Sequence, residues 1–274
     1  MIGKPSNIAS YTTSLLASGR LVFTGEEAQK AIGIGQGPFL DAAEKLQRRR
    51  RLLRPRRGFY VVVPPEYLNL GSPPPAWFID DLMRHEGCAY YVGMLKAAEL
   101  HGAAHQAAMV FQVIANKRIP AILRGRSSIA FYYRKDMAAV SAAIEEHKTE
   151  TGKMKVSSAE LTFLDLIRYP QASGGLDNVA TVLGELGRKL DADKLALLSS
   201  AFERSVMQRA GYLLSRAGLG HHADRLHASL GAGSAVQWIE LDPALAADPD
   251  LASPVVERDK RWRVIVRRPP EQDP

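Results

Sequence analysis

Apolar residues recur at helical spacing in the first fifty positions of the chain, and short extended runs separate these segments. The spacing predicts helices over residues 8–18 and 26–31, a short strand over residues 21–23, and a third helix that starts at Pro38. The apolar face of this third helix consists of Phe39, Ala42, Ala43 and Leu46. A hairpin signal follows, in which two extended runs flank a turn rich in arginine, proline and glycine. This order of elements is typical of a winged helix-turn-helix.

A proline-rich stretch follows the hairpin, with five prolines within residues 64–75. Proline disfavours regular structure, so we place a domain boundary between residues 70 and 71. Helical and β-prone segments are mixed beyond it, and we expect its first strands to form a small antiparallel sheet. Helices are predicted over residues 76–85, 91–101, 159–168, 176–190, 193–202, 205–217 and 222–230, and strands over residues 109–115, 121–123, 129–133, 153–156, 236–241 and 262–266, while residues 138–146 fit either type.

These patterns predict an α+β protein with an N-terminal winged helix-turn-helix at residues 1–70, a larger mixed α+β domain at residues 71–268, and a disordered tail at residues 269–274. The hydrophobic fraction of 46% and the charged fraction of 24% are typical of a folded, soluble protein. No apolar run approaches the roughly 20 residues that a membrane span needs. The single cysteine, Cys88, excludes an intrachain disulfide and fits a reducing compartment, so we expect a cytoplasmic protein.

Positive charge is concentrated at one end of the chain. Residues 1–70 hold 11 Lys/Arg against 5 Asp/Glu, a balance of +6, whereas residues 71–274 hold 25 against 24, a balance of +1. A local basic excess favours a polyanionic partner for the first segment, with nucleic acid ahead of a membrane surface.

Seven arginines lie between Arg48 and Arg57. Arginine forms bidentate hydrogen bonds to phosphate and to guanine, so the cluster predicts contact with DNA. The alternatives are a solvated basic surface and arginines held in internal ion pairs. Asp41 and Glu44 share the outward face of the third helix and limit how much of it can approach phosphate. The predicted DNA-binding residues are Gln36, Lys45, Arg48 and Arg49 at the helix, and Arg54, Arg56 and Arg57 at the hairpin.

Other candidate sites in the sequence have ordinary structural explanations. The glycine-rich turn at residues 33–37 lacks the Lys-Ser/Thr ending of a nucleotide-binding loop. The histidine pairs show no known metal-ligand pattern, and carboxylates such as Glu160 and Asp165 suit a helix start better than catalysis. We therefore predict no catalytic residue, no metal site and no cofactor. Scattered basic residues of the second domain fit either a further nucleic-acid or toxin contact or solvated strand ends: Lys117, Arg118, Arg124, Arg126, Arg134 and Lys135.

Several strings in the second domain resemble the AbiEi-type antitoxins. They are YYVG at residues 90–93, AAELHGAAHQ at 97–106, KVSSAELT at 155–162, LDL at 164–166, RYP at 168–170 and GGLD at 174–177. With the winged-helix pattern before them, the resemblance covers about residues 8–268.

The resemblance implies an antitoxin of a bacterial abortive-infection toxin–antitoxin pair. In that family the winged helix represses the shared operon by binding inverted repeats in double-stranded DNA, which implies a dimer on DNA. The C-terminal domain supplies antitoxicity against a nucleotidyltransferase-like toxin, and whether the two proteins touch stays open. The alternatives are an enzyme that a winged helix targets to nucleic acid, namely a nuclease or nucleotidyltransferase, and a ligand-responsive transcription regulator.

Overall fold

A computed structural model describes residues 5–103, 108–124, 127–230, 237–246 and 254–271. The chain forms two compact units, each of which is assembled from several segments. The first contains Met1–Val92, Met109–Met137 and Glu146–Val156, and the second contains Gly93–Ala108, Ala138–Glu145 and Ser157–Pro274. The predicted boundary between residues 70 and 71 falls within the first unit and stays a prediction.

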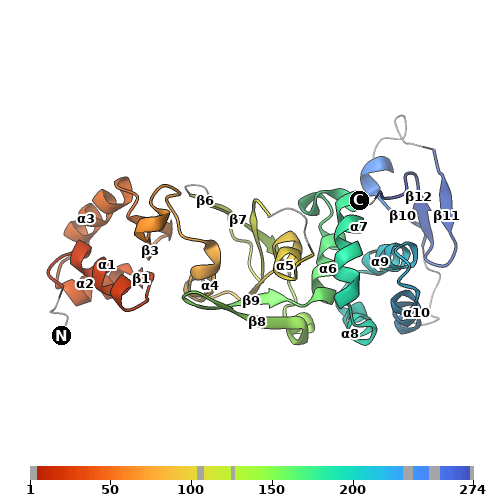
Figure 1. Ribbon diagram of the computed structural model, residues 1–274, viewed down its shortest axis with the longest axis horizontal. Coiled ribbons are helices and arrows are strands. Elements are labelled where there is room, and N and C mark those ends of the chain that lie inside the picture. Colours follow the sequence, from red (N-terminus) through yellow and green to blue (C-terminus); the bar gives the residue numbers. More distant parts are fainter. Residues whose placement is uncertain (1–4, 104–107, 125–126, 231–236, 247–253, 272–274) are drawn as a thin grey trace. The chain divides into compact units, whose positions relative to one another are not determined.

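Three helices and a three-stranded sheet form the N-terminal part of the first unit (Figure 1). The strands are antiparallel in the order β1-β3-β2. Asn7 and Thr24 cap the first two helices, because their side-chain oxygens accept hydrogen bonds from the backbone N–H groups of Ser10 and Glu27. The elements are α1 (Ile8–Ala17), β1 (Val22–Thr24), α2 (Gly25–Ile32), α3 (Gln36–Arg48), β2 (Leu52–Arg56) and β3 (Phe59–Val62).

Glycines separate α2 from α3. Gly33 ends α2 with a φ of 82°, in the left-handed region that favours glycine, and its N–H donates to the carbonyl of Gln29. Gly35 precedes α3, whose first residue is Gln36, two residues before the predicted start at Pro38. The difference is small in energy, because a proline in the first turn of a helix breaks no intrahelical hydrogen bond.

An aromatic cluster fills the core of this part. The ring of Tyr60 lies 5.4 Å from those of Phe23 and Phe39, measured between centroids, and Tyr11 packs edge-on against Phe23. All four rings are buried. Such pairs contribute about 0.5–1.5 kcal/mol beyond the burial of apolar area. The apolar face predicted for the third helix is confirmed, since α3 supplies Phe39 to this cluster.

A six-stranded mixed sheet completes the first unit, with strand order β6-β7-β5-β4-β9-β8. The predicted small antiparallel sheet is wrong, because β5 pairs with β7 and β4 pairs with β9 in parallel. Parallel pairing joins strands that a loop or helix separates in the sequence, so it leaves no local signal. The elements are α4 (Ile79–His85), β4 (Tyr90–Val92), β5 (Phe111–Ala115), β6 (Ile122–Arg124), β7 (Ser127–Tyr133), β8 (Ile144–Thr149) and β9 (Gly152–Ser157).

The second unit consists mainly of helices around α6, whose residues from Ala159 to Ile167 are all buried. The prediction of a helix over residues 91–101 was wrong at its start, because Tyr90–Val92 is a strand and the helix begins at Met94. The helices are α5 (Met94–Leu100), α6 (Ala159–Arg168), α7 (Gly175–Leu186), α8 (Ala192–Leu197), α9 (Arg204–Arg216) and α10 (Gly220–Ser229).

A small sheet in the order β10-β12-β11 lies at the C-terminal end of the second unit (Figure 1). Its strands are β10 (Ile239–Glu240), β11 (Glu257–Asp259) and β12 (Val264–Val266). The Trp262 ring packs onto α9 at Gly211, and the Trp262 Nε1–H donates to Ser215 Oγ at 3.1 Å. The absent Cβ of Gly211 leaves the space for this ring.

The mixture of helices and strands confirms the predicted α+β class. Among the described residues, no helix has the length and apolar character required to cross a bilayer. Of the predicted disordered tail, residues 272–274 lie outside the described residues. Glu271 is described, and its N–H donates to Asp177 Oδ1 at 3.0 Å.

Candidate nucleic-acid interface

Helix α3 buries its apolar face and exposes the opposite one. Of the predicted DNA-binding residues, Gln36, Lys45 and Arg48 are exposed there. Asp41 and Glu44 are exposed as well, and Glu44 Oε1 lies 2.7 Å from Arg48 Nη2. Both partners of this ion pair are largely solvated, so it contributes little to stability. Its main effect is to offset the charge of Arg48, and the outward face of α3 is therefore close to neutral.

The run of consecutive arginines turns away from the helix axis. Arg49 is the C-cap residue of α3, and Arg50 follows with a φ of 56°, in the left-handed region. The Arg50 N–H donates to the carbonyl of Gln47 and the Arg51 N–H to that of Leu46, both at 2.9 Å. This pair of bonds is the Schellman motif, in which glycine usually occupies the left-handed position. All three arginines are exposed, but beyond the last turn of α3.

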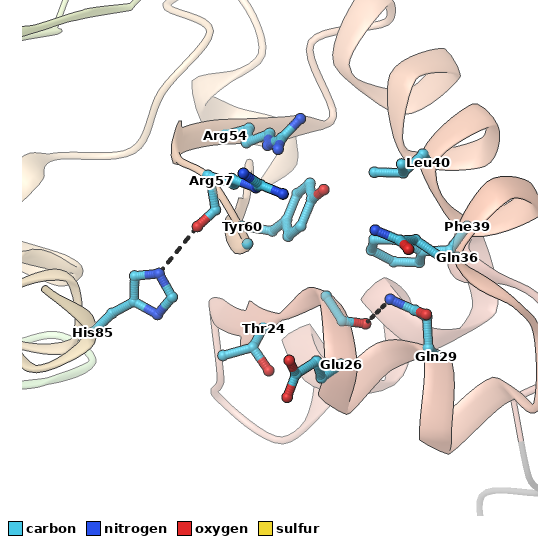
Figure 2. Close-up of a pocket in the computed structure, with 12 residues that line it drawn as sticks. Thr24, Glu26, Gln29, Gln36, Phe39, Leu40, Arg54, Arg57, Tyr60 and His85 are labelled. Carbon is cyan, nitrogen blue, oxygen red and sulfur yellow. Dashed lines mark hydrogen bonds between the residues drawn. The ribbon is translucent and has the colours of Figure 1, made fainter.

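The β2–β3 hairpin carries the second group of predicted residues. Arg57 and Gly58 form its two-residue turn, in which Gly58 has a φ of 77°. Arg57 is exposed, and its carbonyl accepts a hydrogen bond from His85 Nε2 at 3.1 Å (Figure 2). The guanidinium of Arg54 lies 5.6 Å from the centroid of the Tyr60 ring. Arg57 is thus exposed on the hairpin, and Arg54 beside it is partly exposed.

Arg56 lies in a different environment. Its side chain is 19% exposed, its Nε lies 3.7 Å from Glu86 Oε1, and its Nη2 donates to the carbonyl of Pro120. Its guanidinium also lies 5.7 Å from the centroid of the Phe131 ring. These contacts hold Arg56 within the protein. Arg56 therefore fits the alternative that some arginines of the cluster form internal ion pairs. We therefore leave it out of the proposed DNA-binding set.

An open pocket of about 700 Å³ lies between the start of α2, the start of α3 and the hairpin. Figure 2 shows Gln36 and Leu40 of α3 on one side and Arg54 and Arg57 of the hairpin on the other. The carboxylate of Glu26 lies at the α2 side and lowers the positive potential there. The pocket is thus basic on its hairpin side only.

The structure brings together three predicted residues around this pocket: Gln36, Arg54 and Arg57. Lys45, Arg48 and Arg49 do not line it. The sequence interpretation missed Leu40, which is 39% exposed, and His85, which comes from α4. The sequence could have indicated Leu40 as a surface contact residue, since it is an apolar residue outside the apolar face of its helix. His85 carried none, because its contact with the hairpin depends on the fold.

The carboxylates considered for catalysis are engaged within the second unit. Glu160 is 3% exposed, and its two oxygens accept hydrogen bonds from Ser158 Oγ at 2.7 Å and from the Asp191 N–H at 2.9 Å. Asp165 is fully buried on the same helix. The described part of the chain contains no group of three or more potential metal-ligating His, Cys, Asp or Glu side chains, and His105 lies outside it.

One comparison with known protein families matches a central part of the chain. A family model described as the AbiEi antitoxin C-terminal domain matches residues 91–216. This part of the chain belongs to the AbiEi antitoxin family. The predicted resemblance is confirmed, and the match supports an antitoxin role for the protein.

Nearly the whole chain is similar to a solved structure. The crystal structure of the RV2827C protein from Mycobacterium tuberculosis superposes with a TM-score of 0.69 and 18% sequence identity, over 97% of this chain and 94% of that chain. At this identity the likeness shows a shared fold. No curated protein matches the chain.

Two of the strings that carried the resemblance, at residues 97–106 and 155–162, have structural roles within the AbiEi domain. His101 Nε2 donates to the carbonyl of Ser157 at 2.7 Å, which ties the end of α5 to the end of β9. Ser157 Oγ lies 2.6 Å from Thr162 Oγ1, and Ser158 caps α6. The strings thus build a buried polar network at the start of α6, where each hydroxyl has a partner.

Proposed function

We propose that the protein is a DNA-binding transcriptional repressor and antitoxin, in which residues 7–63 form a winged helix-turn-helix. The order α1-β1-α2-α3-β2-β3 supports this proposal, with α3 as the recognition helix and the β2–β3 hairpin as the wing. The observation that carries it is the pair Arg54 and Arg57 on the wing, the first partly exposed and the second exposed, across an open pocket from Gln36 and Leu40 of α3.

The side chains divide into two roles. Arg54, Arg57 and Arg49 contact backbone phosphates, which fixes the register of the protein on the duplex and supplies most of the affinity. Their charges are available, since no described carboxylate lies within ion-pair distance of these three side chains. Lys45 contacts a phosphate at the far end of α3.

Base edges are contacted from the exposed face of α3. Gln36 suits adenine, because its amide both donates and accepts, and Leu40 suits a thymine methyl group. Glu44 suits the amino group of cytosine and holds Arg48 beside it. A nearly neutral recognition face between basic flanks places the sequence-independent attraction on the flanks and leaves discrimination to the helix.

The antitoxin half of the proposal rests on the AbiEi domain. We propose that this domain counteracts a nucleotidyltransferase-like toxin encoded beside it, while the winged helix represses the operon that both share. A palindromic operator requires two copies of the chain, with half-sites separated by a whole number of helical turns of about 10 bp.

Footprinting on the promoter immediately upstream of the gene tests this function. The full-length protein is expected to protect an inverted repeat, with both half-sites on the same face of the duplex. Expression of the neighbouring gene should stop growth, and co-expression of this chain should restore it. A promoter that stays unprotected at protein concentrations that saturate random DNA would rule out specific repression.

A further inference from the structure

The loop between β5 and β6, residues 116–121, lies against the wing within the first unit. Strand β2 of the wing and β6 are neighbours. Arg56 joins them directly, since its guanidinium donates to the carbonyl of Pro120, near the end of the loop. The loop belongs to the AbiEi domain by sequence, so the wing and this domain share one surface here.

The loop is held at its other end as well. Asn116 and Ala89 exchange two hydrogen bonds, each at 3.1 Å, from backbone N–H to carbonyl and from backbone N–H to side-chain oxygen. Lys117 Nζ donates to the carbonyl of Glu86 at 3.2 Å, next to His85, which bonds the wing turn. A segment that is fixed at three points presents its side chains in a defined place.

Two cations on this loop have uncompensated charge. Lys117 and Arg118 are both exposed, and within the described ranges neither has a carboxylate at ion-pair distance. Lys117 bonds a neutral carbonyl, and Arg118 lies 4.9 Å from the centroid of the Tyr133 ring. The carboxylate of Glu86 is engaged by Arg56 instead. Internal ion pairing therefore does not explain these two residues.

We propose that Lys117 and Arg118 bind backbone phosphates of the duplex beside those bound by the wing, and that Arg56 is the positioning residue that holds this loop in place. The proposal rests on the DNA-binding function proposed above and extends its surface beyond residues 7–63. Each strand of a duplex offers a phosphate about every 3.4 Å along the axis, so a second basic segment next to the wing meets further phosphates on the same DNA. Lys135 and Asp136, which follow the neighbouring end of β7, carry opposite formal charges, and the proposal does not depend on them.

The test measures binding of full-length protein to the upstream promoter duplex and to a mixed-sequence duplex over a range of salt concentrations. Lys117→Gln/Arg118→Gln is expected to lower the slope of log affinity against log salt by about 2 and to weaken binding to both duplexes roughly thirtyfold at 0.15 M salt. Lys148→Gln/Lys155→Gln is the matched control. It removes two exposed cations from β8 and β9, at the opposite side of the sheet order from β6, and should leave the slope unchanged.

The positioning role of Arg56 requires a measurement that a purely structural role would not affect. In an Arg56→Ala background that still unfolds cooperatively, adding Lys117→Gln/Arg118→Gln should lower the salt slope by clearly less than it does alone. A full additional loss of about 2 would show that the loop binds DNA without Arg56, and it would overturn the positioning role.

The wing variant Arg54→Gln/Arg57→Gln distinguishes a failure of the loop assignment from a failure of the proposed DNA-binding function. If the wing variant lowers the salt slope and the loop variant equals its control, the loop assignment is overturned and DNA binding stands. If neither variant changes the slope, both proposals are overturned.

Discussion

Arg50 occupies a backbone conformation that suits glycine better than arginine. It holds the left-handed position of the Schellman motif that ends α3, with a φ of 56°. A side chain costs roughly 1 kcal/mol in that region, whereas glycine has no Cβ to clash. Arg50→Gly is therefore expected to raise the free energy of unfolding by about 1 kcal/mol, as measured by urea denaturation. Arg50→Ala is the control, because it removes the charge and keeps the strain. A glycine variant no more stable than the alanine variant would contradict the assignment.

Gly211 lies in the middle of α9 and Gly184 in the last turn of α7, and the two should respond to alanine in opposite directions. A Cβ at Gly211 would lie 2.2 Å from the Trp262 ring, whereas one at Gly184 meets nothing within 4 Å. Gly211→Ala is expected to cost about 1–3 kcal/mol through overpacking, and Gly184→Ala to gain up to about 1 kcal/mol through helix propensity. Thermal unfolding of the two variants checks both signs. Equal shifts would show that the ring can move without cost.

Residue identity alone could not distinguish the roles of Arg56 and Arg57. Both are arginines at the hairpin, and the sequence predicted the same role for each. The structure places Arg57 in the exposed turn and Arg56 against Glu86 and Pro120, which are 30 and 64 positions further along the chain. Charge density is a local property of the sequence, whereas the partner of a charge is set by long-range packing.

Elements with a strong local signal were predicted well. The side chains of Asn7 and Thr24 cap the starts of α1 and α2, and the apolar spacing predicted both helices to within a residue or two at each end. Strand β4 was not, because an apolar run of three residues next to a helix fits either type of structure. The parallel pairs of the larger sheet also escaped, since periodicity specifies which face of a strand is buried and not its neighbour.

The contact between Asp177 and the C-terminal segment predicts a pH-dependent contribution to stability. Partial burial raises the pKa of Asp177, but the hydrogen bonds from Arg268 and from the Glu271 N–H outweigh it and hold that pKa below its ordinary value. A carboxylate with a lowered pKa stabilises the fold above its unfolded pKa, near 3.9, and this contribution disappears as the pH falls through the folded value.

Arg268→Ala should therefore lower the melting temperature at pH 7 by a small amount, on the order of 1 °C, because both side chains are about half exposed. The difference from wild type should shrink as the pH falls through the lowered pKa of Asp177, and it should vanish once Asp177 is protonated in both proteins. Melting curves from pH 7 to pH 3 check this. A gap that stays constant over the whole range would show that the ion pair is not its cause.

The AbiEi domain and the proposed DNA-binding surface differ in how strongly the sequence indicates them. The AbiEi domain is identified by its strings, one of which forms buried hydrogen bonds such as that between the hydroxyls of Ser157 and Thr162. The proposed DNA-binding surface is indicated by charge and by element order. In the structure, its predicted residues lie in different environments. Arg54 and Arg57 face a pocket, Arg56 holds a loop, and Arg48 is offset by Glu44.

The salt dependence of binding to the upstream promoter duplex tests the central claim most directly, with wild type compared with Arg54→Gln/Arg57→Gln. Because each phosphate contact contributes about 0.9 to the slope of log affinity against log salt, the wing variant should lose about 2 from that slope. Its affinity should fall about equally for promoter and mixed-sequence DNA, while Lys148→Gln/Lys155→Gln behaves as wild type. A wing variant with the slope and affinity of wild type would contradict the proposal that this chain binds DNA through its basic hairpin.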